Sequence, residues 1–139
     1  MPTSTPFISP RGPEPVGPYP HARRVGNLLF VSGIGPRKRG EKDIPGVTRD
    51  AGGNVTSYDI DAQCRSCFDN IRVILEDAGA KWEDIVDVTS FLTDMKRDFA
   101  VYNKVYDEYF GKVRPTRTTV EVGALPTQIN VELKVIAAL

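Results

Sequence analysis

The apolar residues between positions 60 and 78 recur at the spacing of an α-helix, and this pattern constrains the fold more than any other feature of the chain. Asp59 or Asp61 can cap the start of this helix, and Gly79 is a suitable C-terminal stop. A helix with one apolar face has to pack against another element. The members of the stripe lie 4, 4, 3, 4 and 3 residues apart: Ile60, Cys64, Phe68, Ile71, Leu75 and Ala78.

A second helix is predicted from a cap at Asp98 to Gly111. Aromatic residues at helical spacing are more often part of a core than a surface for stacking. Those of this stripe are accompanied by one valine: Phe99, Tyr102, Val105, Tyr106, Tyr109 and Phe110. Strands are predicted where the chain is β-branched and apolar or alternates in polarity: 27–34, 85–92, 117–122 and 130–139.

The segments rich in proline, glycine and charge are predicted to form an arm and turns. Seven of the eleven prolines lie within the first twenty residues. Since proline fixes φ and lacks an N–H, we expect residues 1–20 to form an extended, irregular arm rather than a helix or central strand. The stretch 51–54 predicts a hairpin turn between strands near Pro45–Arg49 and Val55–Tyr58. The basic run at 37–39 is typical of a solvated loop.

The length and the order of the elements predict a single α+β domain. The chain has 139 residues, the usual size of one domain, and 40% of them are hydrophobic, enough for one core. About six strands and two helices favour a mixed sheet with both helices packed on one face. The opposite face also carries valine and isoleucine. A small domain with two apolar sheet faces is expected to oligomerise.

Charge and hydropathy exclude several classes of function. With 18 basic and 18 acidic residues the net charge is zero, which argues against a nucleic-acid binder. No apolar run approaches the length of about 18 residues of a membrane span, and residues 1–19 lack the pattern of a signal peptide. Cys64 and Cys67 fall in the helical pattern without a second pair or a nearby histidine, so we interpret them as buried packing thiols. These features predict a soluble, cytoplasmic protein.

The chain contains little standard catalytic machinery. His21 is the only histidine, and a single exposed histidine in a loop is seldom catalytic. No phosphate-binding loop, dinucleotide motif or metal-ligand cluster occurs. Arg117 opens a strand after a proline-constrained turn and can grip a carboxylate. Glu132 lies between Val131 and Leu133, where partial burial would raise its pKa toward the range useful for proton transfer. Composition and spacing alone favour the alternative that both are surface strand residues or pair with each other.

Several segments together resemble the Rid family, which is also called YjgF. The most specific is the run from Arg114 to Pro126, with the pattern P-x-R-x-x-V-x-V-x-x-L-P, and it occurs together with Gly17-Pro18-Tyr19 and the strand end Ser32-Gly33. The likeness extends from about residue 15 to the C-terminus. Within the family, segments 34–47 and 118–126 are more similar to bacterial members that deaminate 2-aminomuconate.

The resemblance implies a chorismate-mutase-like fold and a homotrimer, or a hexamer of two trimers. The sheets of three subunits would face inward as a barrel, with active sites in the clefts between neighbours. It also implies hydrolysis of enamines and imines derived from amino acids, with release of ammonia and without a metal or organic cofactor. The closer likeness implies conversion of 2-aminomuconate to 2-oxo-3-hexenedioate in the degradation of aromatic compounds.

The resemblance also assigns roles to individual residues. Arg117 matches the arginine that grips the substrate carboxylate, and Glu132 matches the glutamate that positions or activates water. Thr119 stands where many relatives carry cysteine, so a thiol nucleophile is not required. Basic residues of the loop 37–54 are candidates to attract a dianionic substrate, with plain solvation as the alternative. The matches expected to bind substrate are Tyr19, Ser32, Gly33, Asn103 and Thr119.

Three other functions are weighed against this one. A broad-specificity Rid enzyme would act on imines of the 2-aminoacrylate type. A non-enzymatic regulatory trimer would bind 2-oxo acids through Arg117 and release no ammonia. Ribonuclease activity, a label sometimes attached to this family, is disfavoured by the zero net charge and the lack of a basic aromatic stripe.

Overall fold

The computed structural model describes residues 3–139 and contains eight strands and two long helices. All the predicted elements occur in their predicted order, and two strands near the N-terminus, β1 and β2, are additional. No helix in the described part of the chain has the length and apolarity needed to cross a membrane. In chain order the elements are β1 (Ser4–Phe7), β2 (Ala22–Val25), β3 (Leu28–Val31), β4 (Val47–Arg49), β5 (Val55–Tyr58), α1 (Ile60–Asp77), β6 (Ile85–Leu92), α2 (Met95–Phe110), β7 (Thr116–Glu121) and β8 (Val131–Ala138).

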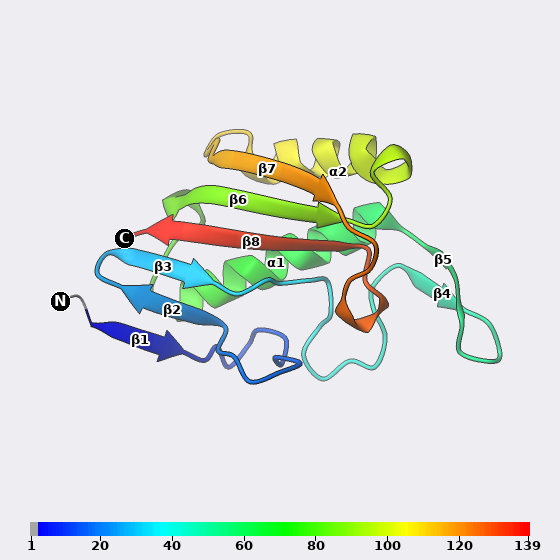
Figure 1. The fold of residues 1–139 in the computed structure, drawn as a ribbon, viewed down its shortest axis with the longest axis horizontal. Helices are drawn as coiled ribbons and strands as arrows, with labels where there is room; N and C mark the ends of the chain where they lie inside the picture. The colour runs from blue at the N-terminus through cyan, green and yellow to red at the C-terminus, as the bar shows by residue number, and fades with distance from the viewer. Residues whose placement is uncertain (1–2) are drawn as a thin grey trace.

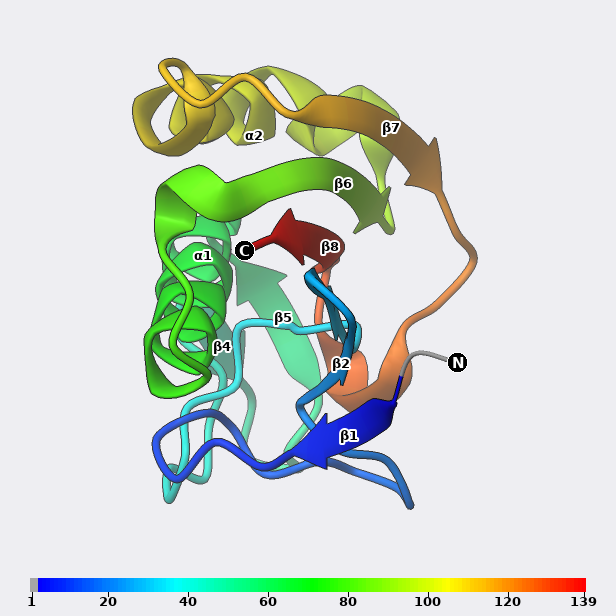
Figure 2. The same ribbon diagram turned by 90° about the vertical axis from the view of Figure 1, so that its left-hand side faces the viewer.

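Six strands form one mixed sheet in the order β1-β2-β3-β8-β6-β7, with β8 near its centre (Figure 1). Neighbouring strands are antiparallel except β6 and β7, which are parallel and are connected by α2. Both helices lie behind the sheet in Figure 1 and on the same side of it in Figure 2. The strands β4 and β5 form a separate hairpin. The predicted α+β architecture, with two helices on one face of a mixed six-stranded sheet, is confirmed, but two of the six strands are β1 and β2 instead of the predicted hairpin strands β4 and β5.

The core lies between β8 and the two helices. The predicted stripe of α1 is buried against the sheet, and Phe68 meets Tyr109 of α2 edge to face, with 5.0 Å between the ring centroids. Cys64 and Cys67 are free and fully buried, and burial raises the pKa of the Cys64 thiol to about 12. The interpretation of both as packing thiols is confirmed. Alternate residues of β8 complete this core: Val131, Leu133, Val135 and Ala137.

The helix N-termini show which acidic residue caps each helix. Of the two predicted caps of α1, Asp59 is the one used, because its carboxylate accepts hydrogen bonds from backbone N–H groups of the first turn. The cap of α2 is Asp94, which accepts from the N–H of Arg97. Asp98 is instead buried one turn into the helix and accepts a hydrogen bond of 2.6 Å from the hydroxyl of Tyr58. The prediction of a cap at Asp98 is therefore wrong.

The N-terminal arm is more ordered than its proline content predicts. Strand β1 contains Pro6 and pairs with β2 at the edge of the sheet, where a missing N–H is tolerated. Further along the arm, Ser9 donates a hydrogen bond of 2.7 Å to Asp77 at the end of α1, and Arg11 forms an ion pair of 2.6 Å with the same carboxylate. The expectation of an irregular arm is therefore wrong for residues 4–7. The contacts of Ser9 and Arg11 with Asp77 hold the next part of the arm against α1.

The basic run 37–39 lies in a loop, as predicted, but its side chains form hydrogen bonds with other parts of the protein instead of being only solvated. Arg37 donates a hydrogen bond of 2.7 Å to the carbonyl of Glu14, and Arg39 donates one of 2.7 Å to the carbonyl of Gly12. Lys38 donates to an amide side chain of α1. The sequence analysis missed these contacts because the acceptors lie in the N-terminal arm and in α1, at positions distant in the sequence.

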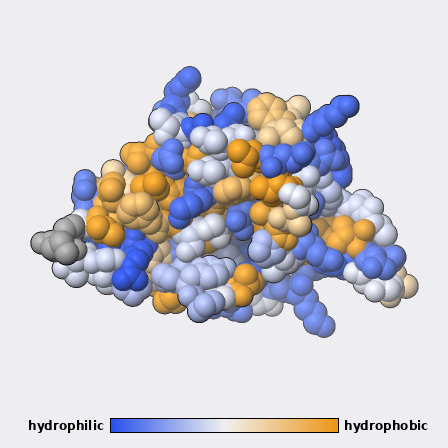
Figure 3. All heavy atoms as spheres, viewed as in Figure 1, coloured by the Kyte–Doolittle hydropathy of each residue, from blue (hydrophilic) through white to orange (hydrophobic). Residues whose placement is uncertain are grey.

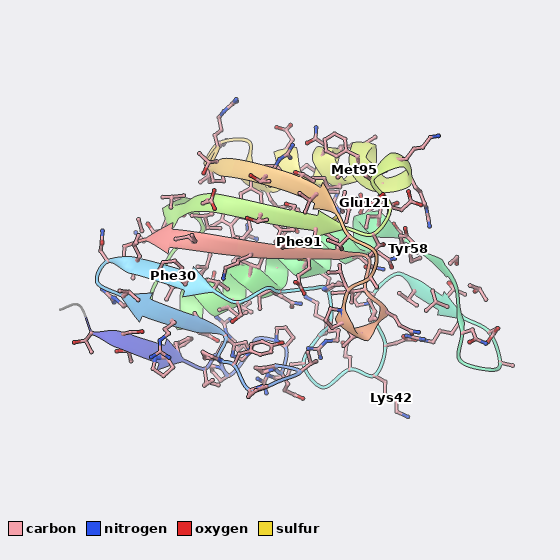
Figure 4. The ribbon with its side chains drawn as sticks, viewed as in Figure 1. Phe30, Lys42, Tyr58, Phe91, Met95 and Glu121 are labelled. Atoms are coloured by element: carbon pink, nitrogen blue, oxygen red, sulfur yellow. The ribbon has the colours of Figure 1, made fainter. Side chains whose placement is uncertain are left out.

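The sheet face away from the helices carries uncovered apolar side chains. The strand register places Phe91 beside Val120 and Phe30 beside Ile136, all on this face. Figure 4 labels Phe30 and Phe91 on the side toward the viewer, and Figure 3 shows apolar residues gathered on the same side. Val120 is 38% exposed. An apolar face of this kind marks an interaction surface. The trimeric barrel stays a prediction, which this face supports.

The Tyr58–Asp98 hydrogen bond provides a test of how the hairpin is held against α2. Tyr58→Phe leaves the carboxylate of Asp98, which is 1% exposed, with only the 3.5 Å contact to Arg97. We expect the free energy of unfolding, measured by urea denaturation, to fall by about 1–3 kcal/mol. The control is Tyr109→Phe, whose partner Asp69 has a 48% exposed side chain that water can solvate, so the loss is smaller. Equal losses in the two variants would contradict this account.

Candidate functional site

Arg117 lies in a groove between β7 and α2 with a volume of ≈ 600 Å³. Its Nη1 donates a hydrogen bond of 2.9 Å to Oδ1 of Asn103 on α2. Its guanidinium carbon lies 4.6 Å from the ring centroid of Tyr106 and 5.4 Å from that of Tyr102, within range of cation–π attraction. One amide and two aromatic rings therefore fix a half-buried guanidinium at the wall of the groove.

This guanidinium and the hydroxyls beside it have unused hydrogen-bonding capacity. Within residues 3–139, Arg117 forms no ion pair with a carboxylate. In the same part of the chain, the buried hydroxyls of Tyr106 and Thr119 have no hydrogen-bond partner. Burial raises the pKa of Tyr106 to about 12, so its hydroxyl keeps its proton and can donate it to an acceptor. A fixed cation beside unsatisfied hydroxyls is suited to binding a carboxylate.

Glu132 lies in a second cavity, on the sheet face away from the helices. This cavity has a volume of ≈ 50 Å³ and is bounded by the N-terminal arm, the end of β3 and the turn before β8. Burial raises the pKa of the Glu132 carboxyl, which brings it closer to the range where a carboxylate exchanges protons near neutral pH. Gly33 packs against this carboxyl: a Cβ at Gly33 would lie 2.6 Å from Oε2 of Glu132. A larger residue at position 33 would therefore require the carboxyl of Glu132 to move.

Two other residues predicted to bind substrate are Tyr19 and Ser32, and only Tyr19 lines the cavity of Glu132. Tyr19 lines the cavity, and its hydroxyl accepts a hydrogen bond of 3.2 Å from the N–H of Val16 in the arm. Ser32 does not line the cavity. Its hydroxyl points elsewhere and donates a hydrogen bond of 2.7 Å to the carbonyl of Pro20. The Ser32 side chain thus fixes the path of the chain next to Gly33.

Arg117 and Glu132 are separated by the sheet. In the β7–β6–β8 register Arg117 lies opposite Val88, which lies opposite the buried Val135, so Arg117 is on the helix side. Glu132 lies opposite Phe91, on the other side. Residues in register share a face and successive residues alternate, so the two cannot pair within one chain. We call Arg117, Asn103 and Thr119 the helix-side group, and Tyr19, Gly33 and Glu132 the open-face group.

His21 is buried, contrary to the expectation of an exposed loop residue. Its Nδ1 accepts a hydrogen bond of 2.9 Å from the N–H of Ser9, and its Nε2 donates one of 2.7 Å to the carbonyl of Pro13. Both ring nitrogens are therefore used to hold the N-terminal arm. Among residues 3–139, no cluster of three or more His, Cys, Asp or Glu side chains is placed to hold a metal ion.

Beside each group lies a residue that the sequence analysis did not assign to the site. Tyr106 lies under the guanidinium of Arg117, and its spacing of three residues from Asn103 on α2 is the signal that places both on one helix face. Arg37 lines the cavity of Glu132. The basic run drew attention to Arg37, but nothing local to that run shows which of its members reaches the cavity.

Comparison with known proteins gives consistent matches over nearly the whole chain. Residues 10–139 match the family model described as "Endoribonuclease L-PSP". A RutC family protein of Pyrococcus abyssi is 42% identical over 131 residues, which cover 94% of this chain and 94% of the relative. A Dermatophagoides farinae protein named 2-iminobutanoate/2-iminopropanoate deaminase is 33% identical over 132 residues, with coverage of 94% and 93%. The crystal structure of E. coli TdcF with bound serine has a TM-score of 0.82 at 30% identity and covers 97% of this chain and 98% of that one.

The raised pKa of Glu132 predicts how stability depends on pH. The folded protein binds this proton more tightly than the unfolded chain, so ionisation of Glu132 lowers the free energy of unfolding as the pH rises. Glu132→Gln removes this loss. We therefore expect the variant to be more stable than the unsubstituted protein near pH 7, and the difference to vanish near pH 3.5, where the carboxyl is protonated in both states.

Chemical denaturation at the two pH values measures this difference. The matched control is Glu41→Gln, which removes an exposed carboxylate in a loop. We expect its free energy of unfolding to equal that of the unsubstituted protein at both pH values. A Glu132→Gln variant that is less stable than the unsubstituted protein near pH 7 would show that the carboxylate stabilises the fold.

Proposed function

The chain belongs to the Rid family, also called YjgF, whose model is described as endoribonuclease L-PSP, and we propose that it hydrolyses imines and enamines of small 2-oxo acids and releases ammonia. The half-buried, unpaired guanidinium of Arg117 is the observation that carries this proposal. Two relatives support it. The Dermatophagoides farinae protein is named an imine deaminase, and E. coli TdcF was crystallised with serine, a ligand that bears a carboxylate.

The proposed site lies between two copies of the chain, because the reaction needs the helix-side group and the open-face group together. Strand β7 is an edge strand of the sheet, so the groove of Arg117 is available to a neighbouring copy. The uncovered apolar sheet face supplies a surface for that contact. A closed ring of copies, here a homotrimer, joins each helix-side group to the open-face group of the next copy.

Binding begins with the carboxylate next to C2 of the substrate. Arg117 grips this carboxylate with two N–H groups, while Asn103 and the ring of Tyr106 hold the guanidinium in place. The hydroxyl of Thr119 lies on the same face of β7 and is available to the bound ligand. An enamine substrate first takes a proton from solvent on carbon, which converts it to an iminium ion with an electrophilic C2.

Hydrolysis then needs one water molecule and a group that moves protons. Glu132 of the adjoining copy accepts a proton from the water as its oxygen bonds to C2. The same carboxyl passes this proton to the nitrogen of the carbinolamine that results. As the C–N bond breaks and ammonia leaves, the carboxylate takes the remaining hydroxyl proton and the 2-oxo acid forms. The raised pKa of Glu132 suits this exchange. No covalent intermediate with the protein is required, so threonine at position 119 is sufficient.

The finer proposal is that the substrate is 2-aminomuconate and the product 2-oxo-3-hexenedioate. The sequence segments 34–47 and 118–126 support this choice of substrate. The broader alternative is a deaminase of monocarboxylate imines, such as 2-iminopropanoate. Turnover of both substrates under the same conditions separates the two, and binding of 2-oxo acids without ammonia release would instead indicate a regulatory protein.

Substitution of Arg117 tests the proposed function. Arg117→Met removes two charge-assisted hydrogen bonds to the substrate carboxylate, together about 3 kcal/mol, so we expect kcat/KM for imine hydrolysis to fall about 100-fold. Arg117→Lys keeps the positive charge but not the two-pronged geometry, so we expect its kcat/KM to lie between those of the unsubstituted protein and Arg117→Met. The assay generates the imine in place by enzymatic oxidation of an amino acid and follows its disappearance and the release of ammonia.

The matched control is Lys104→Met, which removes a positive charge from the same groove without touching the proposed carboxylate clamp. We expect its kcat/KM to stay within about twofold of the unsubstituted protein. Near-normal turnover by Arg117→Met, with the protein folded, would remove this arginine from the proposed role.

A further inference from the structure

Arg37 is the one member of the basic run 37–39 that reaches the cavity of Glu132. Lys38 is engaged with an amide of α1, and Arg39 with carbonyls of the N-terminal arm and with Glu14 at 3.4 Å. The three neighbouring cations therefore have different environments. Only Arg37 shares a cavity with a residue of the proposed reaction.

The guanidinium of Arg37 is half-buried and has donors left over. It donates one hydrogen bond, from Nη2 to the carbonyl of Glu14 at 2.7 Å, and forms no ion pair within residues 3–139. A guanidinium has several further N–H groups. The carboxyl of Glu132 lines the same cavity without pairing with Arg37. Glu14 also lines this cavity, and its carboxylate pairs with Arg39 at 3.4 Å. Among residues 3–139, the guanidinium of Arg37 therefore faces the cavity without a carboxylate partner of its own.

We propose that Arg37 binds a second carboxylate of the substrate, so that this site prefers dicarboxylic imines and enamines to monocarboxylic ones. The inference rests on the proposed function, because Arg117 of the adjoining copy is taken to hold the first carboxylate. Glu132 then lies between the two cations, beside the carbon that water attacks. A dianion bridging two guanidinium groups has its reactive carbon fixed at both ends.

The size of the cavity agrees with this role. Its ≈ 50 Å³ is room for about four water-sized groups, enough for a carboxylate and the carbons next to it but not for a whole substrate. The larger groove beside Arg117, of ≈ 600 Å³, belongs to the helix-side group. The small cavity is thus fitted to one charged end of a longer ligand. An apolar substituent placed there would desolvate the N–H groups of Arg37 that are not bonded to the carbonyl of Glu14 and would offer them no acceptor.

Binding of two stable product-like acids tests the proposal without relying on catalysis. The probes are 2-oxoadipate, a dicarboxylate, and 2-oxobutanoate, a monocarboxylate, titrated into the unsubstituted protein, Arg37→Met and Lys38→Met by calorimetry. We expect Arg37→Met to bind 2-oxoadipate about tenfold more weakly and 2-oxobutanoate unchanged. Lys38→Met removes the adjacent charge outside the cavity and is expected to leave both affinities unchanged.

The other outcomes identify what fails. Unchanged affinity of Arg37→Met for 2-oxoadipate, or equal weakening for both acids, would overturn the role of Arg37. Equal effects of Arg37→Met and Lys38→Met would indicate general attraction by the basic run and would overturn it as well. If the unsubstituted protein prefers 2-oxoadipate through Arg37 but releases no ammonia from the corresponding imines, the proposed function fails while the dicarboxylate site stands. If neither 2-oxoadipate nor 2-oxobutanoate binds to the unsubstituted protein, both proposals are contradicted.

Discussion

The alternation of side chains across the sheet is the constraint on which the proposed site depends. Residues 116–121 of β7, 87–92 of β6 and 131–136 of β8 are paired in continuous register. The position of a residue along its strand therefore decides which face it occupies. Arg117 falls on the helix side and Glu132 on the open side. A single copy therefore presents two incomplete groups, and a substrate can meet both only where an edge of one sheet adjoins the open face of another.

The core and the helix-side group share the same side chains. The aromatic stripe of α2 packs on Phe68 of α1, and its members Tyr102 and Tyr106 also lie under the guanidinium of Arg117. Because these rings are fixed by core packing, the cation has a rigid support, which keeps its position precise for a ligand. Among the described tyrosines of this stripe, Tyr106 is the one whose hydroxyl has no hydrogen-bond partner, and it lies where the ligand is proposed to bind.

Sequence periodicity predicted the elements that local patterns determine, and it failed where distant segments meet. The stripes of α1 and α2 and the alternation of β8 are properties of consecutive residues, so both helices, their face of the sheet and the buried thiols were predicted. The cap of α2 is itself local, since Asp94 accepts from the N–H of Arg97, and the sequence analysis chose the wrong aspartate. The burial of Asp98 against Tyr58 of β5, the burial of His21 and the contacts of the basic run depend on distant segments, which no local pattern reveals. For the site, the residues came from a motif, whereas their division between two faces required the strand register.

The most direct test of the account mixes two variants that are each defective in a different group. Arg117→Ala and Glu132→Gln are purified separately, denatured together in equal amounts and refolded, and the imine-hydrolysing rate is compared with that of each variant alone. If each site takes Arg117 from one copy and Glu132 from the next, random assembly leaves about a quarter of the sites intact and restores about a quarter of the normal rate. A mixture no more active than its components would contradict a site shared between copies.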